Sequence, residues 1–181
     1  MNLLEEIIIH NREFTHPGAF PPLSKSPRRQ LAIFTCMDTR LVDFLEPAMG
    51  LERGDAKIIK NAGNTIVDPH HGGVIRSLVV AIYELGVEEV FVIGHEDCGM
   101  SSLDGPGLRQ KMLDRGVPAK EIDERIPDMA QWVGAFCNPL ENVERVVRVL
   151  RENPLLPDDV PVHGLLFCPN DGHLEIVSSG Y

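Results

Sequence analysis

Short runs of aliphatic, β-branched and aromatic residues recur along the chain, separated by polar and glycine-containing segments. Runs of this length and composition are typical of strands that are buried inside a sheet. The pattern predicts strands over residues 31–35, 56–59, 89–93, 162–167 and 174–177. Residues 17–27, which are rich in proline, predict a connector ahead of the first strand.

Helical periodicity appears between these strands. Between the second and third, apolar residues recur at spacings of four, four and three before Gly86, and this predicts a helix whose inner face is Val74, Leu78, Ile82 and Leu85. A later helix begins at Asn138 and Pro139, where a capping asparagine precedes a proline in the first turn and Glu141 follows. Its apolar face comprises Val143, Val146, Val147 and Leu150.

Alternating strands and helices indicate an α/β fold with a mainly parallel central β-sheet flanked by helices. We expect four parallel strands plus a C-terminal edge strand, all within one domain that spans residues 1–181. In such sheets the functional groups collect just beyond the carboxyl ends of the strands. We therefore expect the functional groups at the ends of the first and third strands.

Composition limits the classes of function. A net charge of -10 disfavours nucleic acid or an anionic membrane as a partner, since an acidic surface repels both. The N-terminus lacks the basic start of a signal peptide, and no apolar run approaches the roughly 18 to 20 residues that span a bilayer. We therefore expect a cytoplasmic protein that acts on a small molecule.

In the cytoplasm cysteines stay reduced, so the four of this chain indicate metal binding or thiol chemistry rather than disulfides. Cys36 follows the first predicted strand, and His95 and Cys98 follow the third. Thiolate and imidazole are the ligands that zinc prefers, and three protein ligands leave the fourth position of a catalytic site open for water. Cys137 and Cys168 have no partner at a useful spacing and are expected to pack.

Asp38 and Arg40 lie two and four residues after Cys36. The carboxylate could orient a zinc-bound water or hydroxide, with Arg40 holding it through a bidentate pair. Released by Arg40, Asp38 could instead become a fourth zinc ligand in a closed state. Spacing alone also allows a merely structural ion pair.

The pattern Cys36-x-Asp38-Thr39-Arg40, followed by His95-x-x-Cys98-Gly99, resembles the β-class carbonic anhydrases. The similarity continues through residues 54–64, 73–77 and 162–166, and the short chain looks most like the compact prokaryotic and archaeal clade. The resemblance implies one zinc ion per chain on Cys36, His95 and Cys98. It also implies reversible hydration of carbon dioxide to bicarbonate and a proton, by attack of zinc-bound hydroxide.

The resemblance further implies that Asp38 and Arg40 form a catalytic dyad, and that the pocket edge is made by Asn61, Ala62, Gly63 and Asn64. It implies a homodimer or larger homo-oligomer with the active site at the subunit interface. Residues 1–30 would form a helix and arm that pack on the partner subunit.

Several alternatives stay open at this point. The same scaffold could hydrolyse carbon disulfide or carbonyl sulfide, or serve as a non-catalytic binding module whose zinc Asp38 closes. A cysteine phosphatase fits less well, because three residues rather than five separate Cys36 from Arg40. His70 and His71 could relay protons, although solvated loop histidines are the simpler interpretation.

Overall fold

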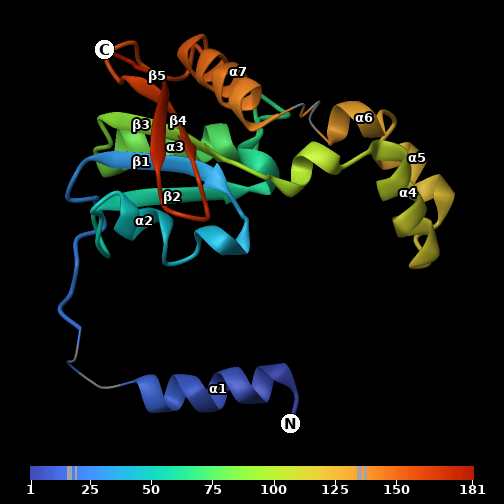
Figure 1. Cartoon of the computed structure of the whole chain (residues 1–181), viewed down its shortest axis with the longest axis horizontal. Helices are drawn as coiled ribbons and strands as arrows, with labels where there is room; N and C mark the ends of the chain where they lie inside the picture. The colour runs from blue at the N-terminus through green and yellow to red at the C-terminus, as the bar shows by residue number, and fades with distance from the viewer. Residues whose placement is uncertain (16–17, 19, 134–135, 137) are drawn as a thin grey trace.

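The computed structural model describes residues 1–15, 18, 20–133, 136 and 138–181. Within that part of the chain, five strands form one sheet in the order β2-β1-β3-β4-β5, and Figure 1 labels each of them. The strands are β1 (Leu31–Cys36), β2 (Ala56–Asn61), β3 (Glu89–His95), β4 (Val162–Phe167) and β5 (Leu174–Ser178). The first four are parallel and β5 is antiparallel to β4, which confirms the predicted fold class.

Alternation along β1 explains why the sheet is buried on both sides. Ala32 and Phe34 face one apolar cluster together with Val90 and Val92 of β3. Leu31 and Ile33 face a second cluster, on the other side of the sheet. All six residues of β1 are buried, as expected for the middle of a doubly covered parallel sheet.

Two long helices cover the first of these faces. Helix α3 (Gly73–Leu85) ends at Gly86, whose left-handed backbone (φ 69°) terminates it as the sequence predicts. Helix α7 (Pro139–Arg151) begins at Asn138, whose side chain accepts a hydrogen bond from the backbone N–H of Glu141. The opposite face is covered by the segment that includes α2 (Leu45–Ala48), through Leu41, Leu45 and Leu51.

The remaining helices lie away from the sheet. Helices α4 (Gly105–Asp114), α5 (Ala119–Arg125) and α6 (Met129–Trp132) project to one side in Figure 1. Helix α1 (Leu3–Phe14) stands apart from the rest of the chain, and none of its twelve residues is buried. Among the described residues, no helix has the length and apolar character needed to cross a membrane.

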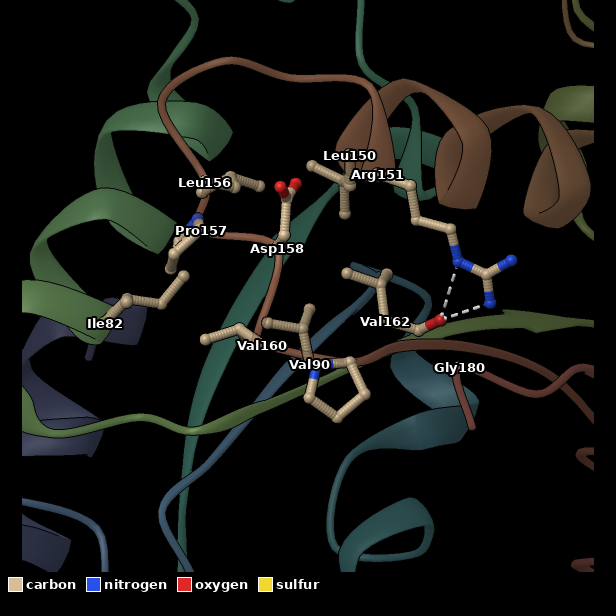
Figure 2. Close-up of a pocket in the computed structure, with 11 residues that line it drawn as sticks. Ile82, Val90, Leu150, Arg151, Leu156, Pro157, Asp158, Val160, Val162 and Gly180 are labelled. Atoms are coloured by element: carbon tan, nitrogen blue, oxygen red, sulfur yellow. Dashed lines mark hydrogen bonds between the residues drawn. The ribbon is translucent and has the colours of Figure 1, made fainter.

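A cavity of about 140 Å³ opens at the amino ends of β3 and β4. Figure 2 shows its mainly apolar lining, with Arg151 at the margin. Arg151 donates to the carbonyl oxygens of Val162 (2.7 Å) and Ser179 (2.8 Å), and so ties the C-terminal segment to β4. Since the predicted ligands lie at the carboxyl ends of the strands, this cavity is remote from them.

Candidate metal centre

The parallel pairing of β1 with β3 brings the predicted ligands to one edge of the sheet. Thr35 is paired with Ile93, so Cys36 and His95 end neighbouring strands at nearly the same level. Cys98 lies in the turn that follows β3. The two sulfur atoms and one imidazole nitrogen all lie within 4.8 Å of one another, and all three residues are buried. Among the described residues, these three are the side chains that lie close enough together to share one metal ion.

His95 is held in the orientation that a metal ligand requires. Its Nδ1 lies 2.8 Å from the carbonyl oxygen of Glu96. A carbonyl can only accept, so Nδ1 carries a proton, and in the neutral ring Nε2 has the lone pair that a metal would take. Nε2 is buried without a hydrogen-bond partner among the described residues, and the nearest charged oxygen, on Asp38, is 3.7 Å away.

The two cysteines have different electrostatic environments. Burial raises the pKa of Cys36, but the imidazole of His95 and the backbone N–H groups of Gly63 and Asp38 outweigh it, and the net shift is downward. For Cys98, burial and the neighbouring Cys36 sulfur raise the pKa to about 11. A cation between the sulfurs would stabilise both thiolates.

These observations fit a zinc ion. Two sulfur atoms and one imidazole, all from buried residues, lie close together. Nε2 of the imidazole has no hydrogen-bond partner among the described residues. Tetrahedral zinc accepts this donor set and leaves a fourth position. Cys36, His95 and Cys98 are thus able to hold the metal.

Asp38 and Arg40 form a bidentate pair beside this group. Arg40 Nε and Nη2 donate to the two carboxylate oxygens of Asp38 at 3.0 and 2.9 Å. The backbone N–H of Arg40 also donates to Asp38, at 2.9 Å. Chiefly because of the side-chain bonds from Arg40, the pKa of Asp38 falls to about 2, so the carboxylate is ionised at any working pH.

Arg40 has a second partner that the sequence did not reveal. Its Nη1 donates to the carboxylate of Asp97 at 3.0 Å, and its Nη2 donates to the Asp97 carbonyl at 2.8 Å. Asp97 has a left-handed backbone with φ 50°. Arg40 therefore links the segment after Cys36 to the turn between His95 and Cys98.

A pocket of about 310 Å³ lies over the candidate ligands. Ala62 and Gly63 are part of its wall, together with the methionines Met37 and Met100. Asn61 and Asn64 are not among its lining residues. Asn61 instead clamps the backbone of Thr65 through two hydrogen bonds, and Asn64 is buried. Two of the four predicted pocket residues thus line the pocket, and two support it from behind.

Gly63 connects the pocket wall to a candidate ligand. Its N–H donates to the sulfur of Cys36 at 3.3 Å. Its backbone is left-handed (φ 67°), and a β-carbon there would come 2.8 Å from Met100 Cγ. Only glycine suits both the conformation and the close packing.

The other candidates lie outside this arrangement. His70 and His71 are exposed, do not line the pocket, and donate their backbone N–H groups to Asp68. Cys168 is partly exposed, with its backbone bonded to that of Gly172 and His173. Cys137, which was expected to pack, lies outside the described residues.

Fold and site together define an α/β protein with a candidate metal centre of two thiols and one imidazole. The sequence profile of the carbonic anhydrase family matches residues 31–174. The chain therefore belongs to the carbonic anhydrase family, in its β class, and is an enzyme of that family.

Individual proteins show the same relationship. The chain is 42% identical to YtiB of Bacillus subtilis, provisionally named a carbonic anhydrase, over 100% of this chain and 99% of the relative. The crystal structure of the β-carbonic anhydrase TvaCA1 from Trichomonas vaginalis is 43% identical, with a TM-score of 0.95 and complete coverage of both chains. A carbon disulfide hydrolase of Acidithiobacillus thiooxidans is 31% identical over 81% of this chain and 76% of its own.

Proposed function

We propose that this enzyme catalyses the zinc-dependent, reversible hydration of carbon dioxide to bicarbonate and a proton. The observation that carries the proposal is the convergence of Cys36, His95 and Cys98 within 4.8 Å, under a pocket and beside an ionised Asp38. One zinc ion per chain would be held by these three residues. Family membership supports the same reaction.

Each side chain then has a defined task. Zinc, when bound, acidifies a coordinated water and so makes a nucleophile available near neutral pH. Asp38, ionised and fixed by Arg40, accepts a hydrogen bond from that nucleophile and orients it towards the pocket. Because Arg40 occupies both carboxylate oxygens, it also keeps Asp38 from turning onto the metal as a fourth ligand.

The pocket supplies the substrate site. Met37 and Met100 line it with thioether side chains, and Ala62 and Gly63 complete a wall that suits a small, uncharged, linear molecule. Within residues 61–64, the backbone N–H of Ala62 would contact bicarbonate at the pocket wall, with Asn61 and Asn64 holding that segment in shape. The Asp38–Arg40 pair supports an enzyme over a binding module closed permanently by Asp38.

Carbon disulfide hydrolysis is the second candidate. It is favoured by relatives named carbon disulfide hydrolase that share up to 31% identity with this chain. Both substrates are linear and would use the same ligands. The two functions therefore differ in which substrate reaches the metal centre and how fast it is turned over, and not in the residues that bind the metal.

The two candidates are tested with the zinc-loaded protein. Stopped-flow recording of proton release measures hydration of carbon dioxide, and sulfide release from carbon disulfide is measured in parallel. The proposal predicts rapid, saturable hydration with little or no sulfide. Sulfide release without hydration would establish the second candidate instead.

We further propose that residues 1–181 are a single domain that acts as a homodimer or larger homo-oligomer in the cytoplasm. Residues 1–30 would serve as an arm on a second copy, because α1 exposes Leu3, Leu4, Ile7 and Phe14 to solvent. Met37, at the pocket, is 64% exposed, and a second copy would cover it and complete the active site at the interface. A cytoplasmic setting also keeps thiol ligands reduced.

A further inference from the structure

A buried polar side chain on α7 reaches the loop behind the candidate metal centre. Asn142 is 3% exposed, although the other buried positions of the helix are apolar and pack in the core. Its Nδ2 donates to the carbonyl oxygen of Gly63 at 3.0 Å. Gly63 in turn donates its N–H to the sulfur of Cys36 at 3.3 Å. Two hydrogen bonds thus connect the interior of α7 to a candidate ligand.

The loop needs support from outside. Gly63 and Asn64 are consecutive residues with left-handed backbones, at φ 67° and 42°. Such conformations persist when surrounding contacts determine them, and for asparagine the position is uncommon. The Asn142 amide also lies 3.4 Å from the Asn64 carbonyl oxygen, so both left-handed residues are held by one side chain.

The orientation of that amide is itself fixed. Arg145 Nη2 donates to Asn142 Oδ1 at 2.8 Å. Because the oxygen is occupied by a cation, the nitrogen must face Gly63. Arg145 therefore fixes the Asn142 amide in the orientation that donates a hydrogen bond to the Gly63 carbonyl.

We infer that Asn142 is a positioning residue for the metal centre, acting through Gly63 on the sulfur of Cys36. The inference rests on the proposed function, since it requires a metal on Cys36. A hydrogen bond to a thiolate withdraws charge from it and fixes its direction, and partners outside the ligand set commonly alter metal affinity by 10- to 100-fold. Loss of the Asn142 donor lets the Gly63 N–H move away from Cys36.

The chain supplies a matched control. Asn153 is also a buried asparagine, 6% exposed, and its Nδ2 also donates to a loop carbonyl, that of Pro69. Its side chain bonds to Pro69 and Leu155, outside the loop of residues 61–64 that Asn142 holds. Asn142→Leu and Asn153→Leu each remove one buried amide donor and keep a side chain of similar size.

The experiment uses the full chain with its metal replaced by cobalt(II). Wild type and both variants are compared by the sulfur-to-cobalt charge-transfer band and by competition with a chelator. Asn142→Leu is expected to move the band to longer wavelength and to lower the affinity for cobalt roughly 10-fold. Asn153→Leu is expected to leave both readouts at wild-type values.

A second variant guards against misfolding. Asn142→Asp keeps the shape of the side chain and the acceptor for Arg145, and replaces the donor to Gly63 with a charged carboxylate oxygen that the Gly63 carbonyl repels. It is expected to shift the band in the same direction. Equal readouts for all the variants and wild type would overturn the inference alone, whereas a wild type without a sulfur-to-cobalt band would overturn the proposed function itself.

Discussion

At the scale of single residues, the carboxylate of Asp38 and the backbone of Gly63 are the features on which the site depends. Asp38 is 3.7 Å from the His95 nitrogen, close enough to accept a hydrogen bond from a molecule bound at the metal. Arg40 keeps it ionised and, in the proposed function, out of the ligand set. Gly63 brings a backbone donor to Cys36 while leaving room for the pocket. Each role can be removed by one substitution.

Asp38→Asn should retain zinc and lose most carbon dioxide hydration, on the order of 100-fold, because the orienting acceptor is lost while every ligand remains. Zinc content and stopped-flow turnover are measured on the same preparation. Asp43→Asn is the control, since Asp43 is an exposed aspartate on the same segment. Turnover of Asp38→Asn equal to that of the control would show that the Asp38–Arg40 pair has only a structural role.

Gly63→Ala should destabilise the fold and weaken metal binding. A left-handed alanine costs roughly 1–2 kcal/mol, and its methyl group would also collide with Met100. Gly86→Ala is the matched control, because Gly86 has nearly the same φ (69°) and open space around the added carbon. By chemical denaturation, Gly86→Ala should lose less folding stability than Gly63→Ala. By metal titration, Gly86→Ala should keep the wild-type affinity for the metal. Identical results for both variants would contradict this account of Gly63.

At the scale of elements, the sheet was predictable because its signals are local. Buried strands are continuous apolar runs, and α3 and α7 carry their periodicity and caps within a few residues. Helices α4 to α6 were missed because only a few of their side chains are buried, which leaves little periodicity.

The grouping of the three candidate ligands was predictable for a similar reason, since each lies at or just after the end of a predicted strand. The contacts that shape the site were not. The Arg40 bond to Asp97 spans 57 positions, and the Asn142 bond to Gly63 spans 79. Neither pair has a spacing that sequence patterns reveal, and both depend on how the sheet and α7 pack.

The attachment of the N-terminal segment to the sheet gives a pH-dependent prediction. The backbone N–H of Glu52 and the side chain of Arg28 lower the pKa of Asp55. A carboxylate with a lowered folded pKa contributes stability above its unfolded pKa of about 4, and that stability is lost as the pH falls below it.

Asp55→Asn should therefore melt at a lower temperature than wild type at pH 7, with the difference shrinking below about pH 4. Thermal unfolding at pH 7 and at a pH below about 4 measures this difference in melting temperature. Exposed Asp159→Asn should melt with wild type at each pH. A difference between Asp55→Asn and wild type that persists undiminished in acid would contradict the assigned role of this carboxylate.

At the scale of the whole molecule, α1 is the part that the single chain leaves unexplained. It has a complete capping box at Asn2 and Glu5, yet no buried residue. Isolated helices of this length are marginal in water, so its apolar side chains require a surface to pack on. A second copy of the chain supplies one in the proposed oligomer.

Ile7→Glu should shift the protein towards monomer, because it places a charge among Leu3, Leu4 and Phe14, which are all more than half exposed. Ile9→Glu is the control, since a residue two positions on points to nearly the opposite side of the helix. Sedimentation velocity of both variants and wild type measures the change. A wild type that sediments as a monomer would contradict the proposal that residues 1–30 pack on a second copy of the chain.

The most direct test of the whole account is X-ray absorption at the zinc edge of the purified protein. The account predicts one zinc per chain with two sulfur neighbours at about 2.3 Å and the remaining nitrogen and oxygen neighbours at about 2.0–2.1 Å. Cys98→Ser should lose one sulfur neighbour or the metal itself. Zinc surrounded by four sulfurs or by none, or a protein that binds no zinc, would contradict it.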